Sequence, residues 1–200
     1  MIIEHSIDEA YLDYKKYLVN KGELKTDERG DKVYQIPYYN IIFMDWYNNI
    51  GGMDIVPVPK KTGFNFKSLQ DYSNQLLDHE LHGFVYTYGN RLREYFSIDQ
   101  IESMMKHIDK DINSRRAVAI TIDPSIDNYE DDIPCLQHLA INVYDNHLIM
   151  EVLFRSNDIR YAFVPNMYGL MNLQLYMGHE LGITAGDMYY TCYNPHWKLK

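Results

Sequence analysis

The sequence IPCLQHLAINVYDNHLIMEVLFRSND, residues 133–158, contains two runs rich in apolar, β-branched and aromatic residues. The runs cover residues 139–144 and 147–154, and Asp145-Asn146 separates them. Two such runs joined by a two-residue turn sequence predict an antiparallel β-hairpin. We therefore expect a sheet protein built around this hairpin.

Functional residues stand at the two open ends of the predicted hairpin. Cys135 precedes its first strand, and Arg155-Ser156-Asn157-Asp158 follows its second. A thiol becomes a nucleophile when a nearby cation lowers its pKa, and an arginine at a strand end binds phosphate in a forked geometry. The pairing suits a phosphorylated substrate held over a sulfur. The alternatives are a buried apolar cysteine and a surface ion pair for the arginine.

The remaining pattern mixes helices with strands and predicts an α/β or α+β fold with one domain over residues 1–200. Ser6 is a plausible N-cap for a helix over 7–21, with Glu9 completing a capping box and Gly22 at the end. Further helices are expected over 67–79, from Ser97 to about Ser114, and over 166–180. Further strands are expected within 33–47 and over 84–88, 117–122 and 187–192.

Composition limits the classes of function. The chain has 200 residues and a formal net charge of −9, which argues against a general nucleic-acid or anionic-membrane binder. Only two cysteines are present, so we expect a reducing, cytoplasmic setting and no disulfide framework. No signal peptide and no apolar run of membrane-spanning length is apparent. His79 and His82 are a helix-spaced pair, but a metal site needs three or four convergent ligands, so no metal site is expected.

Four further positions carry candidate binding groups, each with a structural alternative. Arg115 and Arg116 follow a predicted helix, where cations also compensate the helix dipole. Asn166 follows Pro165 and either caps a helix or uses its amide to read a pyrimidine edge. His196 is either titratable or a surface residue near the chain end.

Together, the order and spacing of these residues resemble the thymidylate synthase family. From Ser114 onward the spacing is similar to the family's without insertions, and Tyr86 to Arg93 looks most like the short archaeal branch. The resemblance covers residues 84–196 well and the first 83 residues loosely. The motifs are Tyr88-Gly89-Asn90-Arg91-Leu92-Arg93, Ser114-Arg115-Arg116, Pro134-Cys135, Arg155-Ser156-Asn157-Asp158, Pro165-Asn166, Gly186-Asp187 and His196.

The resemblance implies a fold and a reaction. The family fold is a single domain with a twisted mixed sheet flanked by helices, whose sheet stacks on that of its mate in a homodimer. The family reaction transfers a one-carbon unit to C5 of dUMP, giving dTMP. In that scheme Cys135 attacks C6 of the ring. The co-substrate is methylene-tetrahydrofolate or a related reduced pterin, and no metal is needed.

The resemblance also implies a role for each matched residue. Arg155 and Ser156 hold the phosphate, and Arg115 and Arg116 reach the same phosphate across the dimer. Asn166 reads the uracil edge, and Asp158 lies near the pterin and base. The remaining three are Tyr88, which assists removal of the C5 proton through water, His196, which lies near the ribose hydroxyl, and Arg29, which belongs to the phosphate loop.

Several positions depart from the family pattern. Leu136 stands where a histidine usually follows the cysteine, and Lys198 replaces the tyrosine of the ribose-binding pair. Arg29 lies one position later than the family's arginine. Asp45 and Asp54 are the candidates for the catalytic glutamate that relays protons. The chain ends at Lys200, so we expect no C-terminal lid over the folate.

These departures leave two further functions open. A pyrimidine nucleotide hydroxymethylase, acting on dUMP, dCMP or CMP, uses the same cysteine but adds water instead of hydride. Aspartate is usual at the Asn166 position in the cytosine enzymes, so the asparagine favours uracil. A catalytically weak nucleotide-binding homologue is the other alternative, against which the intact Cys135 and its arginines argue.

Overall fold

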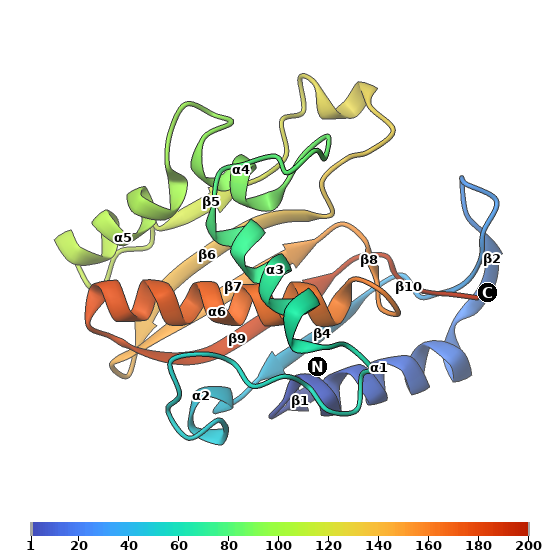
Figure 1. Ribbon diagram of the computed structural model, residues 1–200, viewed down its shortest axis with the longest axis horizontal. Coiled ribbons are helices and arrows are strands. Elements are labelled where there is room, and N and C mark those ends of the chain that lie inside the picture. Colours follow the sequence, from blue (N-terminus) through green and yellow to red (C-terminus); the bar gives the residue numbers. More distant parts are fainter. Residues whose placement is uncertain (1, 200) are drawn as a thin grey trace.

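A computed structural model describes residues 2–199 and shows a mixed α/β fold with two sheets and helices packed against them (Figure 1). The larger sheet has six strands in the order β1-β4-β9-β7-β6-β5, and the smaller has four in the order β2-β3-β10-β8. In the larger sheet the strands are β1 (Ile2–Glu4), β4 (Tyr39–Phe43), β9 (Thr184–Cys192), β7 (His147–Phe154), β6 (Leu136–Tyr144) and β5 (Val118–Ile120). In the smaller sheet they are β2 (Glu23–Thr26), β3 (Lys32–Gln35), β10 (Pro195–Lys198) and β8 (Asn157–Asp158).

The helices belong mainly to the segments where the pattern predicts them. They are α1 (Ile7–Lys21), α2 (Trp46–Asn49), α3 (Phe66–Leu77), α4 (Tyr88–Arg93), α5 (Gln100–Lys110) and α6 (Phe163–Leu181), with a 3₁₀ turn over Asp127–Tyr129. At the start of α1 the Ser6 side chain accepts a hydrogen bond from the Glu9 N–H. The Glu9 carboxylate accepts from the His5 N–H at 3.4 Å, so the predicted cap is present with its return bond shifted by one residue.

The predicted hairpin is confirmed as the antiparallel pair β6–β7. Asp145 and Asn146 both have positive φ, 51° and 60°, as a type I′ turn requires. The register pairs Leu136 with Phe154, and the Arg155 N–H donates to the Cys135 carbonyl at 2.8 Å. The hairpin therefore holds Cys135 and Arg155 side by side at one end of the larger sheet.

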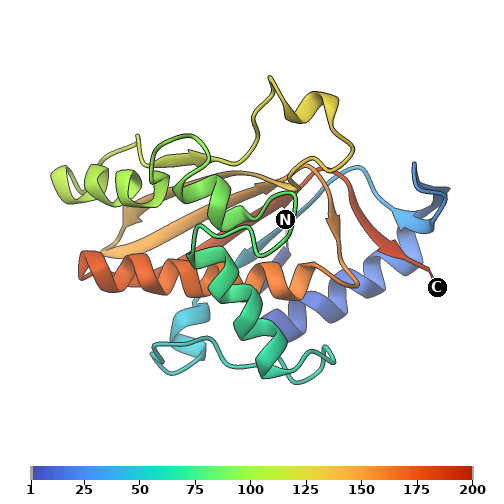
Figure 2. The ribbon, with the colours of Figure 1, turned by 45° about the horizontal axis from the view of Figure 1, so that its top comes forward.

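Helix α6 is the central packing element on the larger sheet (Figures 1 and 2). Nearly every residue from Phe163 to Gln174 is buried, because α6 lies between the sheet and α3. Gly169 brings α3 close, since a Cβ there would already touch the Tyr72 ring at 3.4 Å. Gly182 ends α6 in the left-handed conformation, with φ of 65°. The N-terminal end of α6 thus comes to the same end of the sheet as Cys135 and Arg155.

Two local predictions were wrong. Residues 84–88 were predicted as a strand, but Thr87 instead caps α4 by accepting from the Asn90 N–H at 3.0 Å. Gly89 then packs against the end of α3, where a Cβ would lie 2.0 Å from the Asp78 carbonyl oxygen. Ser97 was predicted to cap the next helix, but it has φ of 59° and Asp99 caps α5 instead. At Thr87 the helix cap outweighs the strand-like composition of residues 84–88. At α5 the cap is Asp99 and not the earlier Ser97.

One face of the larger sheet carries a row of aligned side chains that crosses all six strands. The strand pairings place Ile3, Ile42, Tyr189, Glu151, Ala140 and Val118 in this row. Ile3, Val118 and Tyr189 are 49%, 50% and 40% exposed. Helices α3 and α6 lie over the opposite face (Figure 2). We call the sheet face that carries this row the open sheet face.

No helix within residues 2–199 combines the length and apolarity needed to cross a membrane. In the same residues, no three side chains of histidine, cysteine, aspartate or glutamate converge as metal ligands would.

Candidate active site

A cleft of about 510 Å³ opens where the ends of β6, β7, β10 and α6 meet the β2–β3 turn and α3. Its size is typical of small-molecule sites. The cleft brings together eight of the candidate residues chosen from the sequence. They are Arg29, Tyr88, Cys135, Arg155, Ser156, Asp158, Asn166 and His196.

Cys135 lies half-buried in this cleft, whereas Cys192 is buried at the end of β9. Burial raises the pKa of the Cys135 thiol, and Arg155 and Arg29 oppose that rise. Burial raises the pKa of Cys192 further, to about 12. Cys135 is therefore the accessible and more acidic thiol, although the neighbouring cations do not lower its pKa below the usual range.

Arg155 holds the chain on the N-terminal side of Cys135. Its Nη2 donates to the Ile133 carbonyl at 2.7 Å and its Nε to the Pro134 carbonyl at 3.2 Å. Two of the five guanidinium N–H groups are used in this way, so others remain for an anion in the cleft. Arg155 thus positions the cysteine loop and also supplies positive charge next to the sulfur.

Ser156 and His196 lie together beside Arg155. The Ser156 hydroxyl donates to the Asn194 carbonyl at 3.0 Å and lies 3.3 Å from Nδ1 of His196. The Asn194 side chain donates to the Arg155 carbonyl at 3.1 Å. Strand β10, which was not predicted, therefore places His196 at the cleft by pairing beside β8.

Asn166 lies in the first turn of α6 and is only 2% exposed. Its Oδ1 accepts a hydrogen bond from the Tyr72 hydroxyl of α3. Its Nδ2 donates to Oδ1 of Asn157 at 3.2 Å, and Nδ2 of Asn157 donates to the Tyr190 hydroxyl at 3.1 Å. The amide of Asn166 is thus held from both sides within the cleft.

Tyr88 and Asp158 make contacts to the main chain. The Tyr88 hydroxyl accepts from the Leu136 N–H at 3.2 Å, and burial holds its pKa well above the usual value. It is therefore a neutral phenol that can donate its own proton. Oδ1 of Asp158 accepts from the Arg160 N–H at 2.9 Å and the Tyr161 N–H at 3.3 Å, which fixes its carboxylate before α6.

The opposite rim of the cleft carries two cations in exposed ion pairs. Arg29 pairs with Asp132 at 2.5 Å, and Lys198 pairs with Asp31 at 3.0 Å. The Arg29 and Asp132 side chains are 59% and 56% exposed. Glu28 also lines the cleft beside Arg29. This rim can rearrange more readily than the cysteine side, because its bonds lie in solvent.

Arg115 and Arg116 do not line this cleft. Both are exposed in the turn that joins α5 to β5. Their predicted contact with a phosphate across a dimer stays a prediction.

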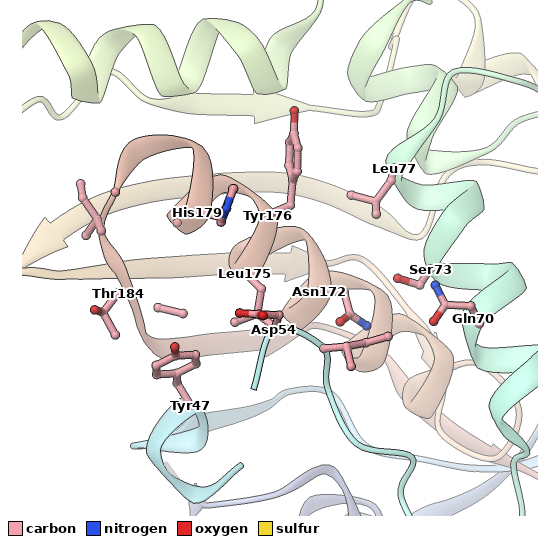
Figure 3. A pocket seen from close by; sticks show the side chains of 15 residues that line it. Tyr47, Asp54, Gln70, Ser73, Leu77, Asn172, Leu175, Tyr176, His179 and Thr184 are labelled. Carbon is pink, nitrogen blue, oxygen red and sulfur yellow. The ribbon is translucent and has the colours of Figure 1, made fainter. Parts of the chain in front are cut away.

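Sequence reasoning missed Tyr72, Tyr86 and Asn157 as cleft residues. Tyr72 belongs to α3, and the periodic apolar face of that helix is the sequence signal that could have placed it against the core beside the cleft. Asp45 and Asp54, considered as proton relays, are not among the residues that line the cleft. Asp54 belongs to a separate cavity of about 540 Å³ between α3, α6 and the loop after α2 (Figure 3). Ser73 and Asn172 face that cavity, and no thiol lines it.

Comparison with known proteins gives consistent matches. The family model described as thymidylate synthase matches residues 62–197. Three archaeal proteins named "Putative thymidylate synthase" are similar over much of the chain. The protein from Methanococcoides burtonii is 31% identical over 94% of this chain and 84% of its own length. The one from Methanothermobacter marburgensis is 31% identical over 94% and 89%, and the one from Methanothermobacter thermautotrophicus is 36% identical over 69% and 62%.

Proposed function

This chain belongs to the thymidylate synthase family, and we propose that it is a methyltransferase that converts dUMP to dTMP through covalent attack of Cys135 on C6. The observation that carries the proposal is the position of the thiol. Cys135 lies in one cleft with Arg155, whose guanidinium group is of a type that binds phosphate, and with the amide of Asn166. A nucleophile, an anion-binding group and a base-reading group are the three elements that this chemistry needs.

The reaction needs a nucleophile because C5 of uracil is unreactive until the 5,6 double bond is saturated. The Cys135 thiolate adds to C6, and the electron pair of the double bond moves toward C5 and the O4 carbonyl. C5 then forms a bond to the methylene carbon of the donor, methylene-tetrahydrofolate or a related reduced pterin, and loses its proton to water. The bond between that carbon and the pterin nitrogen breaks, which leaves an exocyclic methylene on C5. A hydride from the pterin, which is thereby oxidised, reduces this methylene as the thiolate leaves C6 and restores the ring.

Phosphate binding would lower the barrier to addition of the Cys135 thiolate to C6, because it holds the pyrimidine ring over the sulfur. We assign the phosphate to Arg155 and to Ser156, whose hydroxyl would turn from the Asn194 carbonyl to the phosphate, with Arg29 closing from the rim. The free N–H groups of Arg155 support this, since its Nε and one Nη2 hydrogen are used by main-chain carbonyls. Arg29 must exchange Asp132 for the phosphate, which the exposure of that pair allows.

The other cleft residues are assigned to the base and the sugar. Asn166 pairs with the O4 and N3 edge of uracil, and His196 lies near the ribose hydroxyl. Tyr88 donates to the water that removes the C5 proton, because its phenol stays protonated. Asp158, fixed by the Arg160 and Tyr161 N–H groups, lies toward the pterin and base.

A homodimer completes the proposed site. The open sheet face offers the apolar surface for stacking on a second copy, with Ile3, Val118 and Tyr189 exposed. Arg115 and Arg116 then reach the phosphate in the partner's cleft. Their exposure in one subunit supports this assignment, since neither is used within its own chain's cleft.

Release of tritium from C5-labelled dUMP in the presence of methylene-tetrahydrofolate tests the shared first half of the reaction. We expect release with the native protein and none with Cys135→Ala, while the matched control Cys192→Ala retains it. Product mass separates a methyl from a hydroxymethyl product. Absence of release with every pyrimidine monophosphate would overturn the proposal and leave a nucleotide-binding homologue.

Subunit mixing tests the proposed partner arginines. Cys135→Ala and the double variant Arg115→Ala/Arg116→Ala are each expected to be inactive. After the two are unfolded and refolded together, hybrid dimers contain one intact site. Random assortment then restores about one quarter of the native sites. No recovery in a verified mixed dimer would show that the arginines do not act across the interface.

A further inference from the structure

Four side chains from separate elements form one continuous hydrogen-bonded chain beside the cleft. It runs from the Tyr72 hydroxyl of α3 to Asn166 of α6, then to Asn157 of β8 and to the Tyr190 hydroxyl of β9. Asn157, Asn166 and Tyr190 are at most 2% exposed. Buried polar chains of this kind have a defined direction because each donor must meet an acceptor.

The two amides make the direction of the chain important. An amide has a donor end and an acceptor end, and the two ends have nearly the same shape. Oδ1 of Asn166 faces the Tyr72 hydroxyl, and its Nδ2 faces Oδ1 of Asn157. Rotating Asn166 by 180° would place its oxygen against the Asn157 oxygen, so Asn157 and Tyr190 would have to reverse as well.

The tyrosine at the open end opposes that reversal. Burial raises the pKa of Tyr72, so its phenol keeps its proton and needs an acceptor. Among the described residues, Asn166 is the hydrogen-bond partner recorded for the Tyr72 hydroxyl. In the reversed chain Tyr72 would accept from Asn166 and its own proton would lose that partner. The observed direction therefore keeps the Tyr72 phenol donor paired with Asn166.

We propose that Tyr72 and Asn157 are positioning residues that lock the Asn166 amide in one orientation and thereby make the cleft select a uracil over a cytosine ring. This inference rests on the proposed function, in which Asn166 reads the base. Each atom of the locked amide keeps one free hydrogen-bonding position, a donor on Nδ2 and an acceptor on Oδ1.

The two rings differ at the edge that this amide would read. Uracil presents an acceptor at O4 and a donor at N3–H, whereas cytosine presents a donor at its amino group and an acceptor at N3. The locked amide matches uracil directly. Cytosine requires the reversed amide, and a site with buried polar groups rejects a ligand that leaves them unpaired. The direction of the hydrogen-bonded chain therefore sets the selectivity of the cleft for uracil over cytosine.

Calorimetric titration of the full chain with dUMP and dCMP tests the proposal without relying on turnover. In Tyr72→Phe the ring remains but the donor to Oδ1 is gone, so the amide can rotate. We expect the ratio of the dCMP to the dUMP dissociation constant to fall about tenfold, the equivalent of one hydrogen bond. Asn157→Ala removes the other partner and is expected to lower the same ratio.

Tyr168→Phe is the matched control. Tyr168 is also buried on α6, but it does not line the cleft and its hydroxyl has no hydrogen-bond partner within the described residues. The ratio should stay unchanged in this variant. A general loss of stability, followed by thermal unfolding, would weaken both nucleotides equally and leave the ratio where it was.

The outcomes separate the two proposals. If the native protein prefers dUMP and neither Tyr72→Phe nor Asn157→Ala changes the ratio, the positioning role is wrong while the proposed function stands. If the native protein binds neither nucleotide, the proposed function itself fails. If both variants lower the ratio and Tyr168→Phe does not, Tyr72 and Asn157 set the base selectivity.

Discussion

The two sides of the cleft are held by different kinds of interaction. On the cysteine side, Arg155 donates to two main-chain carbonyls and the Tyr88 hydroxyl accepts from the Leu136 N–H. On the rim, Arg29 and Lys198 are held by ion pairs with Asp132 and Asp31 in solvent. The partly buried bonds to the main chain fix geometry, whereas exposed ion pairs contribute little and exchange readily.

Under the proposed function, this difference suits separate tasks for the two sides. A nucleophile must lie within a fraction of an ångström of its target, so the rigid end of the sheet suits Cys135. A group that closes over a bound phosphate, as proposed for Arg29, must move, so the exposed β2–β3 turn suits it.

The largest effect is expected from the buried ion pair between Arg91 and Asp127. Both guanidinium ends of Arg91 bind Asp127 in the loop that leads to Cys135, at 2.7 and 3.1 Å, with side chains 6% and 2% exposed. Asp127→Asn leaves a buried cation unpaired and should lower the free energy of unfolding by about 3–5 kcal/mol. Urea unfolding measures this.

Asp99→Asn is the control for that prediction. Asp99 pairs with Arg93 and is 30% exposed, and asparagine keeps the N-cap of α5. Its cost should be under about 1 kcal/mol. Equal losses in the two variants would show that the cysteine side is no better anchored than a partly exposed ion pair.

The second effect concerns Arg155 itself. Arg155→Ala removes the two bonds to the Ile133 and Pro134 carbonyls together with the proposed phosphate contact. We expect kcat/KM for dUMP to fall more than a hundredfold, which corresponds to a loss of about 3 kcal/mol of transition-state stabilisation. Arg160→Ala, which removes a guanidinium outside the cleft, should cost less than about tenfold. A similar loss in both would contradict the assigned role of Arg155.

The third effect is the pH dependence of thiol alkylation. Only the thiolate reacts with iodoacetamide, and burial raises the pKa of Cys135. The rate for the native protein should therefore rise about tenfold per pH unit from pH 6 to beyond the ordinary thiol value near 8.5. Mass spectrometry should locate the label on Cys135, with Cys192 modified only after unfolding. A plateau below pH 8 would mean that the pKa of Cys135 is lowered.

The smallest effect is expected at the rim. Asp132→Asn releases Arg29, so the free energy of unfolding should change by less than about 0.5 kcal/mol. Affinity for dUMP should rise about two- to fivefold, because Arg29 no longer has to leave a carboxylate. Asp131→Asn changes the adjacent exposed charge without breaking this pair. If it raises affinity equally, the effect is one of net charge alone.

Local patterns predicted the parts of the site that are close in sequence or carried on regular elements. The hairpin put Cys135 beside Arg155 because the turn at Asp145-Asn146 sets the register. The family spacing added Asn166 and His196, and the cleft contains both. The prediction failed where a cap decides the structure, as at Thr87, since strand composition and helix capping compete within the same few residues.

The sequence by itself determined the hairpin, the first helix with its cap, the end of α6 at Gly182, and the choice of Cys135 as the candidate nucleophile. These depend on turn residues, caps and periodicity, which act over a few positions. Only the tertiary structure decided that Tyr72 bonds to Asn166, 94 positions away, and that Asn157 holds the same amide from the other side. Such contacts depend on how α3 packs on α6 beside Gly169, and that packing is settled by the whole core at once.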